Sequence, residues 1–180
     1  MKHFAYYPKV EYSNNLAVNI MVRGKIRDAI LEKTALYYKY TLEDGERFDV
    51  ISNKYYGDSK YVWAIFYANN IIDPEIDTYK PHNQFIEFIK AKYGSIQTPN
   101  QTVHHYEYTD TLSQKVYIID ENTYYEYLGQ YEEETETLKT VRKVTIFEYE
   151  DALNEEKRNI VVLDKRYLLN LTNELKNIFN

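Results

Sequence analysis

The chain has 180 residues and a formal net charge of -6, from 22 Lys and Arg against 28 Asp and Glu. This length predicts one domain or two small ones, and the acidic balance argues against a nucleic-acid binder. Cysteine is absent, which excludes disulfide scaffolds, cysteine nucleophiles and thiolate metal sites.

The N-terminal segment, residues 4–23, is predicted to be an extended arm. Its first part, 6–12, is rich in residues that favour strands, and Pro8 argues against a central strand. Residues 16–22 are compatible with a strand or a short helical piece. The arm has too few apolar residues to form a core of its own, so we expect it to lie on the rest of the molecule or on a neighbour.

Next comes a small module of alternating strand and helix patterns. A strand is predicted over residues 36–42, followed by an Asp44-Gly45 turn, a helix over 47–56 and a second helix over 60–69. Gly57 is expected to end the first helix in the left-handed conformation. A third helix follows His82 and ends at Gly94. The predicted core of the module consists of Phe48, Ile51, Tyr55, Trp63 and Phe66.

The rest of the chain reads as a mixture of strands and helices after a polar boundary at residues 95–101. The predicted elements are strands at 103–108, 116–119 and 124–128, an acidic loop at 132–136, a strand running into a helix at 141–149, a strand at 160–163 and a final helix at 165–179. The expected fold class is therefore α+β.

A search for chemistry finds no constellation that indicates an enzyme. His104 and His105 are adjacent, so in a strand they are expected to point to opposite faces and not to share one ion. No His-Glu-x-x-His spacing occurs, and the serines lack a nucleophile-elbow context. We predict no catalytic residues, no metal and no cofactor. Trp63 has two interpretations, a sugar-stacking residue or a core residue, and its apolar neighbours favour the core.

No run approaches the roughly 18 apolar residues of a membrane helix. The first residues also lack the apolar stretch and cleavage site of a secretory signal. The expectation is a protein made in a cytoplasm and not bound to membrane. Tyrosine is unusually frequent, with 21 residues. Its apolar ring and polar tip suit both half-buried strand positions and contacts with other proteins, and the composition leaves both interpretations open.

The order of several short motifs resembles a known family. Asp44-Gly45-Glu46, the helix leading to Tyr55-Tyr56-Gly57-Asp58, and Asn69-Asn70-Ile71 are similar to the landmarks of the LysM module, a small strand–helix–helix–strand fold. The place of its second strand is taken here by the helical sequence 82–94. This variant, with the arm before it and the segments after it, resembles the LysM-like baseplate wedge proteins of contractile-tailed, T4-type bacteriophages over most of the chain.

The resemblance implies a structural role without catalysis. Such a protein belongs to the virion, in the tail baseplate, after assembly in the host cytoplasm. It occurs in multiple copies around the tail axis and joins other wedge proteins, including the sheath-initiating wedge component. The implied organisation is an extended arm (1–33), a LysM-like module (34–95) and a C-terminal strand and helix region (96–180). The candidate protein-contact residues are Tyr6, Tyr7, Tyr12, Arg158, Ile178 and Phe179.

The alternative function is a LysM-type module that binds cell-wall polymers of N-acetylglucosamine. On this interpretation, the turn at 44–47 and the loop at 70–74 correspond to the segments with which a LysM module holds the sugar. The missing second strand, the long flanks, the single copy and the absence of a Ser/Asn/Gly-rich linker favour the baseplate interpretation.

Overall fold

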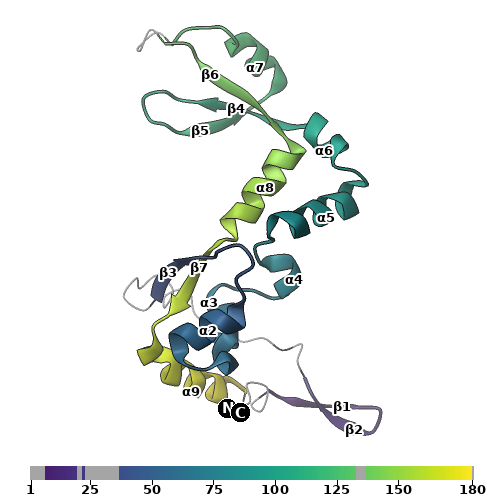
Figure 1. Ribbon diagram of the computed structural model, residues 1–180, viewed down its shortest axis with the longest axis vertical. Coiled ribbons are helices and arrows are strands. Elements are labelled where there is room, and N and C mark those ends of the chain that lie inside the picture. The colour runs from purple at the N-terminus through teal and green to yellow at the C-terminus, as the bar shows by residue number, and fades with distance from the viewer. Residues whose placement is uncertain (1–6, 20–21, 23–36, 133–136, 180) are drawn as a thin grey trace. The chain divides into compact units, whose positions relative to one another are not determined.

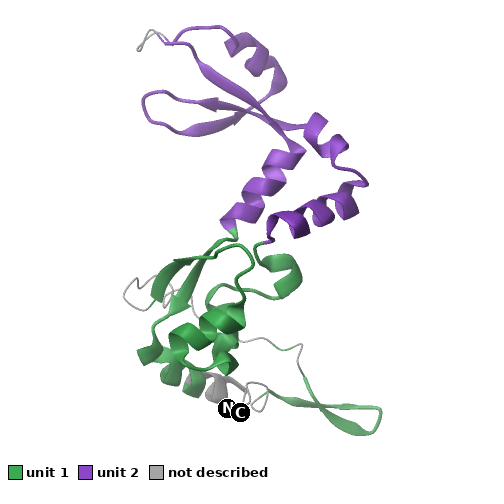
Figure 2. Ribbon diagram, viewed as in Figure 1, with its two compact units in different colours: residues 1–79, 157–180 green, residues 80–156 purple. Residues whose placement is uncertain are grey.

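A computed structural model describes residues 7–19, 22, 37–132 and 137–179, and for 174–179 it describes the backbone only. It contains both helices and strands, in agreement with the expected α+β class. The chain forms two compact units, one of residues 1–79 with 157–180 and one of residues 80–156 (Figure 2). This division differs from the expected boundaries at residues 33 and 95, because the last segment of the chain packs with the first unit.

The first unit is built around a two-stranded sheet made from distant parts of the sequence (Figure 1). Strand β3 (Tyr37–Thr41) pairs antiparallel with β7 (Asn159–Leu163), and Tyr37 lies opposite Leu163. The other elements of the unit are β1 (Lys9–Tyr12), β2 (Asn15–Val18), α2 (Phe48–Tyr56), the 3-10 turn η3 (Ser59–Tyr61), α3 (Val62–Ala68), α4 (Pro74–Asp77), the 3-10 turn η4 (Lys165–Tyr167) and α9 (Leu168–Phe179).

The helices of this unit begin and end where local chemistry predicts. Gly57 ends α2 with φ 82°, and its N–H donates to the carbonyl of Asn53 over 2.9 Å. Asp58 then accepts from the N–H of Lys60 and caps the 3-10 turn. No side chain of α3 is exposed. Both helices pack against β3 and β7 through one core, whose most deeply buried members are Ile51, Ala64, Ile65 and Val162.

The second unit has a three-stranded sheet in the order β5-β4-β6, from β4 (Val103–Thr109), β5 (Val116–Ile119) and β6 (Thr140–Thr145). Its helices are α5 (His82–Tyr93), α6 (Gln97–Gln101), α7 (Glu121–Tyr127) and α8 (Ile146–Glu156). The predicted third helix and its stop at Gly94, with φ 77°, are confirmed. Phe85 and Phe147 join α5 to α8, with ring centroids 5.5 Å apart.

Two predicted elements of this unit are wrong. In the segment 124–128, expected to form a strand, residues 124–127 belong to α7, because the carboxylate of Asp120 accepts from the N–H groups of Asn122 and Thr123 and starts a helix there. The segment 95–101, expected to be a polar boundary, contains α6, and Pro99 in it is fully buried. The predicted acidic loop at 132–136 lies mostly outside the described residues.

Candidate interaction surfaces

The N-terminal arm forms a hairpin that sequence patterns did not reveal. Strands β1 and β2 pair antiparallel from Lys9 opposite Val18 to Tyr12 opposite Asn15. The turn between them has positive φ at Ser13 and Asn14, 49° and 59°, as in the tight turns that join hairpins. The polar Ser13-Asn14-Asn15 run between two strand-forming segments was the available signal.

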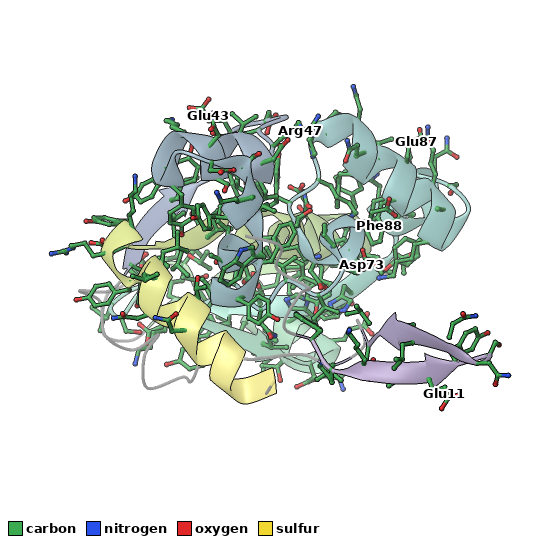
Figure 3. The ribbon with its side chains drawn as sticks, turned by 90° about the horizontal axis from the view of Figure 1, so that it is seen from below. Glu11, Glu43, Arg47, Asp73, Glu87 and Phe88 are labelled. Carbon is green, nitrogen blue, oxygen red and sulfur yellow. The ribbon has the colours of Figure 1, made fainter. Side chains whose placement is uncertain are left out.

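Every residue of both hairpin strands is exposed. Figure 3 shows the side chain of Glu11 on this hairpin. Side chains alternate between the faces of a strand, so Val10 and Tyr12, 41% and 74% exposed, lie on one face of the hairpin. Leu16 and Val18, 75% and 40% exposed, lie on the other. Both faces therefore present apolar side chains to solvent, and an isolated two-stranded hairpin is at best marginally stable in water.

The base of the hairpin is fixed to the first unit by Tyr7. This side chain is buried, and its hydroxyl group is hydrogen-bonded to that of Tyr67 on α3. The N–H of Asn19 donates to the carbonyl of Pro8 over 2.8 Å and closes the open end of the hairpin. Tyr7 was predicted to contact a partner, and the structure places it inside the molecule instead. Tyr12 is exposed, as a contact residue requires.

Arg158, another predicted contact residue, is bound within the first unit. Its guanidinium donates to the carbonyl of Leu42 over 3.1 Å and to the carboxylate of Asp44 over 3.0 Å. It also lies 3.8 Å from the ring centroid of Tyr79, whose hydroxyl donates to Asp44 over 2.7 Å. Arg158 therefore holds the turn after β3. Tyr6 lies outside the described residues, as do the side chains of Ile178 and Phe179.

The predicted module core is brought together as expected. Ile51 and Trp63 are members of the buried cluster, and Phe48 and Tyr55 pack against it. Phe66 is half-buried and makes an edge-to-face contact with Phe48, with centroids 5.3 Å apart. Trp63 is 7% exposed, so its ring has no free face on which a sugar could stack.

Asn69, from the Asn-Asn-Ile landmark, joins α3 to β7. Its side-chain amide donates to the carbonyl of Val161 over 2.7 Å and accepts from the N–H of Val161 over 2.7 Å. The same amide donates to the carbonyl of Ile65 over 2.8 Å. Asn69 thus replaces a strand at the edge of β7, on the side away from β3. Sequence patterns gave no sign of this pairing, because Asn69 and Val161 are far apart in the chain.

The turn at 44–47 and the loop at 70–74, the segments expected to hold sugar if the chain were a LysM module, are used here for internal hydrogen bonds. In the turn after β3, Figure 3 shows Glu43 and Arg47 flanking the segment in which Asp44 binds Tyr79 and Arg158. In the loop after α3, one oxygen of Asp77 accepts from the N–H groups of Ile72 and Asp73, each over 2.8 Å. These groups are therefore already engaged before any ligand arrives.

Many of the tyrosines donate to carboxylates of the same unit. Besides Tyr79 with Asp44, the pairs include Tyr40 with Glu46, Tyr93 with Glu150, Tyr106 with Glu121, Tyr108 with Glu132 and Tyr38 with Asp164. The hydrogen bond to Glu46, helped by burial, raises the pKa of Tyr40 to about 12. A hydrogen bond to Glu132 likewise raises the pKa of Tyr108 to about 12. Part of the tyrosine excess is therefore used for hydrogen bonds inside the fold.

The expected divergence of His104 and His105 is wrong. A β-bulge lies between Val103 and His105, and the Nδ1 atoms of the two histidines are 2.8 Å apart. The bulge breaks the alternation of side chains along β4. His104 stacks on Tyr149 with centroids 3.8 Å apart, while Nε2 of His105 lies 3.1 Å from a carboxylate oxygen of Glu107. Over the described ranges, no three His, Asp or Glu side chains gather as a metal site.

Neither the protein-family models nor the curated proteins contain a match to this chain. No helix in the described part of the chain is long and apolar enough to cross a membrane. Among the described residues, the hairpin of β1 and β2 exposes apolar side chains on both of its faces.

Proposed function

We propose that the protein is a structural connector of a phage tail baseplate, in which it joins neighbouring wedge proteins. The hairpin of β1 and β2 carries this proposal, because it exposes apolar side chains on both faces while Tyr7 anchors its base. Ordering a chain segment costs roughly 1–2 kcal/mol per residue in backbone entropy, and a lone hairpin recovers little of that by itself. A partner that covers the hairpin supplies the missing burial.

The resemblance to the LysM-like wedge proteins supports the same role and names the partners. On that basis the partners are other baseplate wedge proteins, including the sheath-initiating wedge component, in multiple copies around the tail axis. The order of β3, α2, α3 and β7 supports the LysM comparison. Strand β7 was predicted from the sequence, but its partner was not: it follows the second unit in the chain and pairs antiparallel with β3, as the closing strand of a LysM module would.

Hydrogen exchange on the free protein is expected to show weak protection over the hairpin, residues 9–18, and strong protection over residues 47–69. The hairpin residues are exposed, whereas α2 and α3 contain much of the buried core. In assembled baseplates the hairpin amides should become protected. An arm that is already as protected as the helices in the free monomer contradicts the connector proposal.

A pair of variants sharpens this test. Tyr12→Ser with Leu16→Ser removes the two most exposed apolar side chains of the hairpin, 74% and 75% exposed, without disturbing the core. This double variant should melt like the parent but co-assemble with wedge proteins at least about tenfold less tightly. The matched control is Ile72→Ser, at a residue that is 55% exposed in the same unit, and it should assemble normally. Equal assembly of all three proteins counts against the hairpin as the contact.

The alternative, a module that binds polymers of N-acetylglucosamine, gains one observation from the structure. One argument against it was a missing second strand, and that argument fails because β7 pairs with β3. The engaged Asp44 and Asp77 carboxylates still favour the connector.

We expect no useful affinity for chitin oligomers or peptidoglycan fragments. The groups of both candidate sugar loops are held in internal hydrogen bonds, and a sugar has to break them before it can bind. Calorimetric titration of the full chain with chitin oligomers is the direct measurement. Binding with a micromolar or lower dissociation constant moves the assignment to the glycan-binding module.

A further inference from the structure

Strand β5 (Val116–Ile119) is an uncovered edge of the three-stranded sheet in the second unit. In the described part of the chain it pairs with β4 on one side and with no strand on the other. Val116, Tyr117 and Ile118 are 55%, 46% and 75% exposed. Natural edge strands are normally protected by a charge, a proline or a bulge. The β5 strand contains no charged residue and no proline, so it is suited to pairing with another strand.

The hydrogen-bond pattern shows which residues face outward. The carbonyl of Lys115, just before β5, accepts from the N–H of Asp110 over 2.9 Å. Bonded and non-bonded pairs alternate in an antiparallel ladder, so Tyr117 and Ile119 direct their backbone groups toward β4. Val116 and Ile118 then direct theirs toward the free edge. Over the described residues, no backbone hydrogen bond reaches these outward groups.

The outward residues also carry the exposed apolar side chains. Val116 and Ile118 lie on one face of β5, because side chains alternate along a strand. Tyr106 and Tyr117 lie on the opposite face, where Tyr106 contacts Tyr124 of α7 at a centroid distance of 4.8 Å. The free edge therefore combines unpaired backbone groups with two apolar side chains that α7 does not cover.

We propose that β5 pairs antiparallel with β5 of a second copy of this chain, so that two three-stranded sheets become one continuous sheet. In the symmetric register centred on Tyr117, Val116 of each copy lies opposite Ile118 of the other. In each of these two pairs, the two residues then form two backbone hydrogen bonds with each other. All the outward groups of Val116 and Ile118 find partners, and apolar side chains meet apolar side chains on the same face.

This self-complementarity is the reason to choose a second copy over a foreign strand. A register centred on Ile118 places Val116 opposite Asp120, which is engaged as the cap of α7. The strand has 4 residues, so the buried area falls well below the roughly 800 Å² per partner of a standard stable interface. The dimer is therefore weak and forms at high local concentration. This pairing is independent of the proposed baseplate role.

Cysteine cross-linking tests the pairing cleanly, since the chain contains no cysteine. In the proposed register Tyr117 of one copy lies directly opposite Tyr117 of the other, in a pair without backbone hydrogen bonds. The Cα atoms of such a pair are about 4.5 Å apart, which is within the range that a disulfide can bridge. The full-length Tyr117→Cys variant should form a covalent dimer about tenfold faster than Tyr125→Cys under the same mild oxidation. Tyr125 is the matched control, 53% exposed on α7.

A second change separates edge pairing from random collision. Ile118→Lys, added to Tyr117→Cys, places a charge at the paired edge and should slow dimer formation to the control rate. Leu112→Lys, at a residue 64% exposed in the turn before β5, should leave the rate unchanged. Equal rates for Tyr117→Cys and Tyr125→Cys overturn the proposal, as does cross-linking of Tyr117→Cys only to a different protein.

Discussion

Replacing Trp63 with alanine is expected to lower the free energy of unfolding by about 3–5 kcal/mol, as for other large-to-small changes of buried aromatic residues. Trp63 is 7% exposed in the core shared by α2, α3 and β7, and its ring contacts Tyr67 at a centroid distance of 5.9 Å. Small domains have only about 5–15 kcal/mol of stability in total. The variant should therefore be largely unfolded, or close to unfolding, at moderate temperature.

Urea unfolding followed by far-UV circular dichroism measures this effect, because the variant lacks the chain's only tryptophan and with it the fluorescence probe. Leu169→Ala is the matched control, since Leu169 is 69% exposed on α9 of the same unit. Its stability should change by less than about 0.5 kcal/mol. If Trp63→Ala melts within a few degrees of the parent, the ring is not a core residue and the sugar-stacking interpretation returns.

Asn69→Ala should have the second largest effect, a loss of about 1–3 kcal/mol. The change removes both partners of the Val161 backbone, whose N–H and carbonyl each lie 2.7 Å from the Asn69 amide. An unpaired backbone group in a partly buried site costs much more than the net gain of an ordinary hydrogen bond. The edge of β7 should loosen first, and hydrogen exchange at Val161 should increase along with the loss of global stability.

Asn100→Ala is a closely matched control. The Asn100 amide donates to the carbonyl of Ile96 over 2.9 Å, as Asn69 donates to Ile65, but within the described part of the chain it has no hydrogen bond to a strand. Its loss should cost less than about 0.5 kcal/mol. Asn69→Asp keeps the side-chain volume but places a carboxylate oxygen against the carbonyl oxygens of Ile65 and Val161. This variant should therefore lower the free energy of unfolding at neutral pH. If Asn69→Ala and Asn100→Ala lower the free energy of unfolding by similar amounts, the hydrogen bonds to Val161 contribute little to stability.

Local sequence signals predicted α2, α3, α5 and α9, and they missed α4, α6 and α7. The apolar spacing of Phe48, Ile51 and Tyr55 and the stop at Gly57 specify α2, and the stop at Gly94 specifies the end of α5. These signals work because helix periodicity and left-handed caps depend on residues within one or two turns. The tyrosine-rich segment at 124–128 was wrongly predicted as a strand, because the N-cap at Asp120 makes it helical.

Long-range contacts decided the features on which the proposals rest. No local pattern links residues 37–41 with 159–163, so the pairing of β3 with β7, the bond from Asn69 to Val161 and the internal role of Arg158 emerge only in the folded chain. The exposure of the hairpin and of β5 has the same origin, because whether a strand stays uncovered depends on what the rest of the chain leaves beside it. By itself the sequence determined the local elements, the absence of cysteine chemistry and the module core. Tertiary structure alone decided which apolar side chains remain exposed, since burial is a property of the whole packing and not of any one segment.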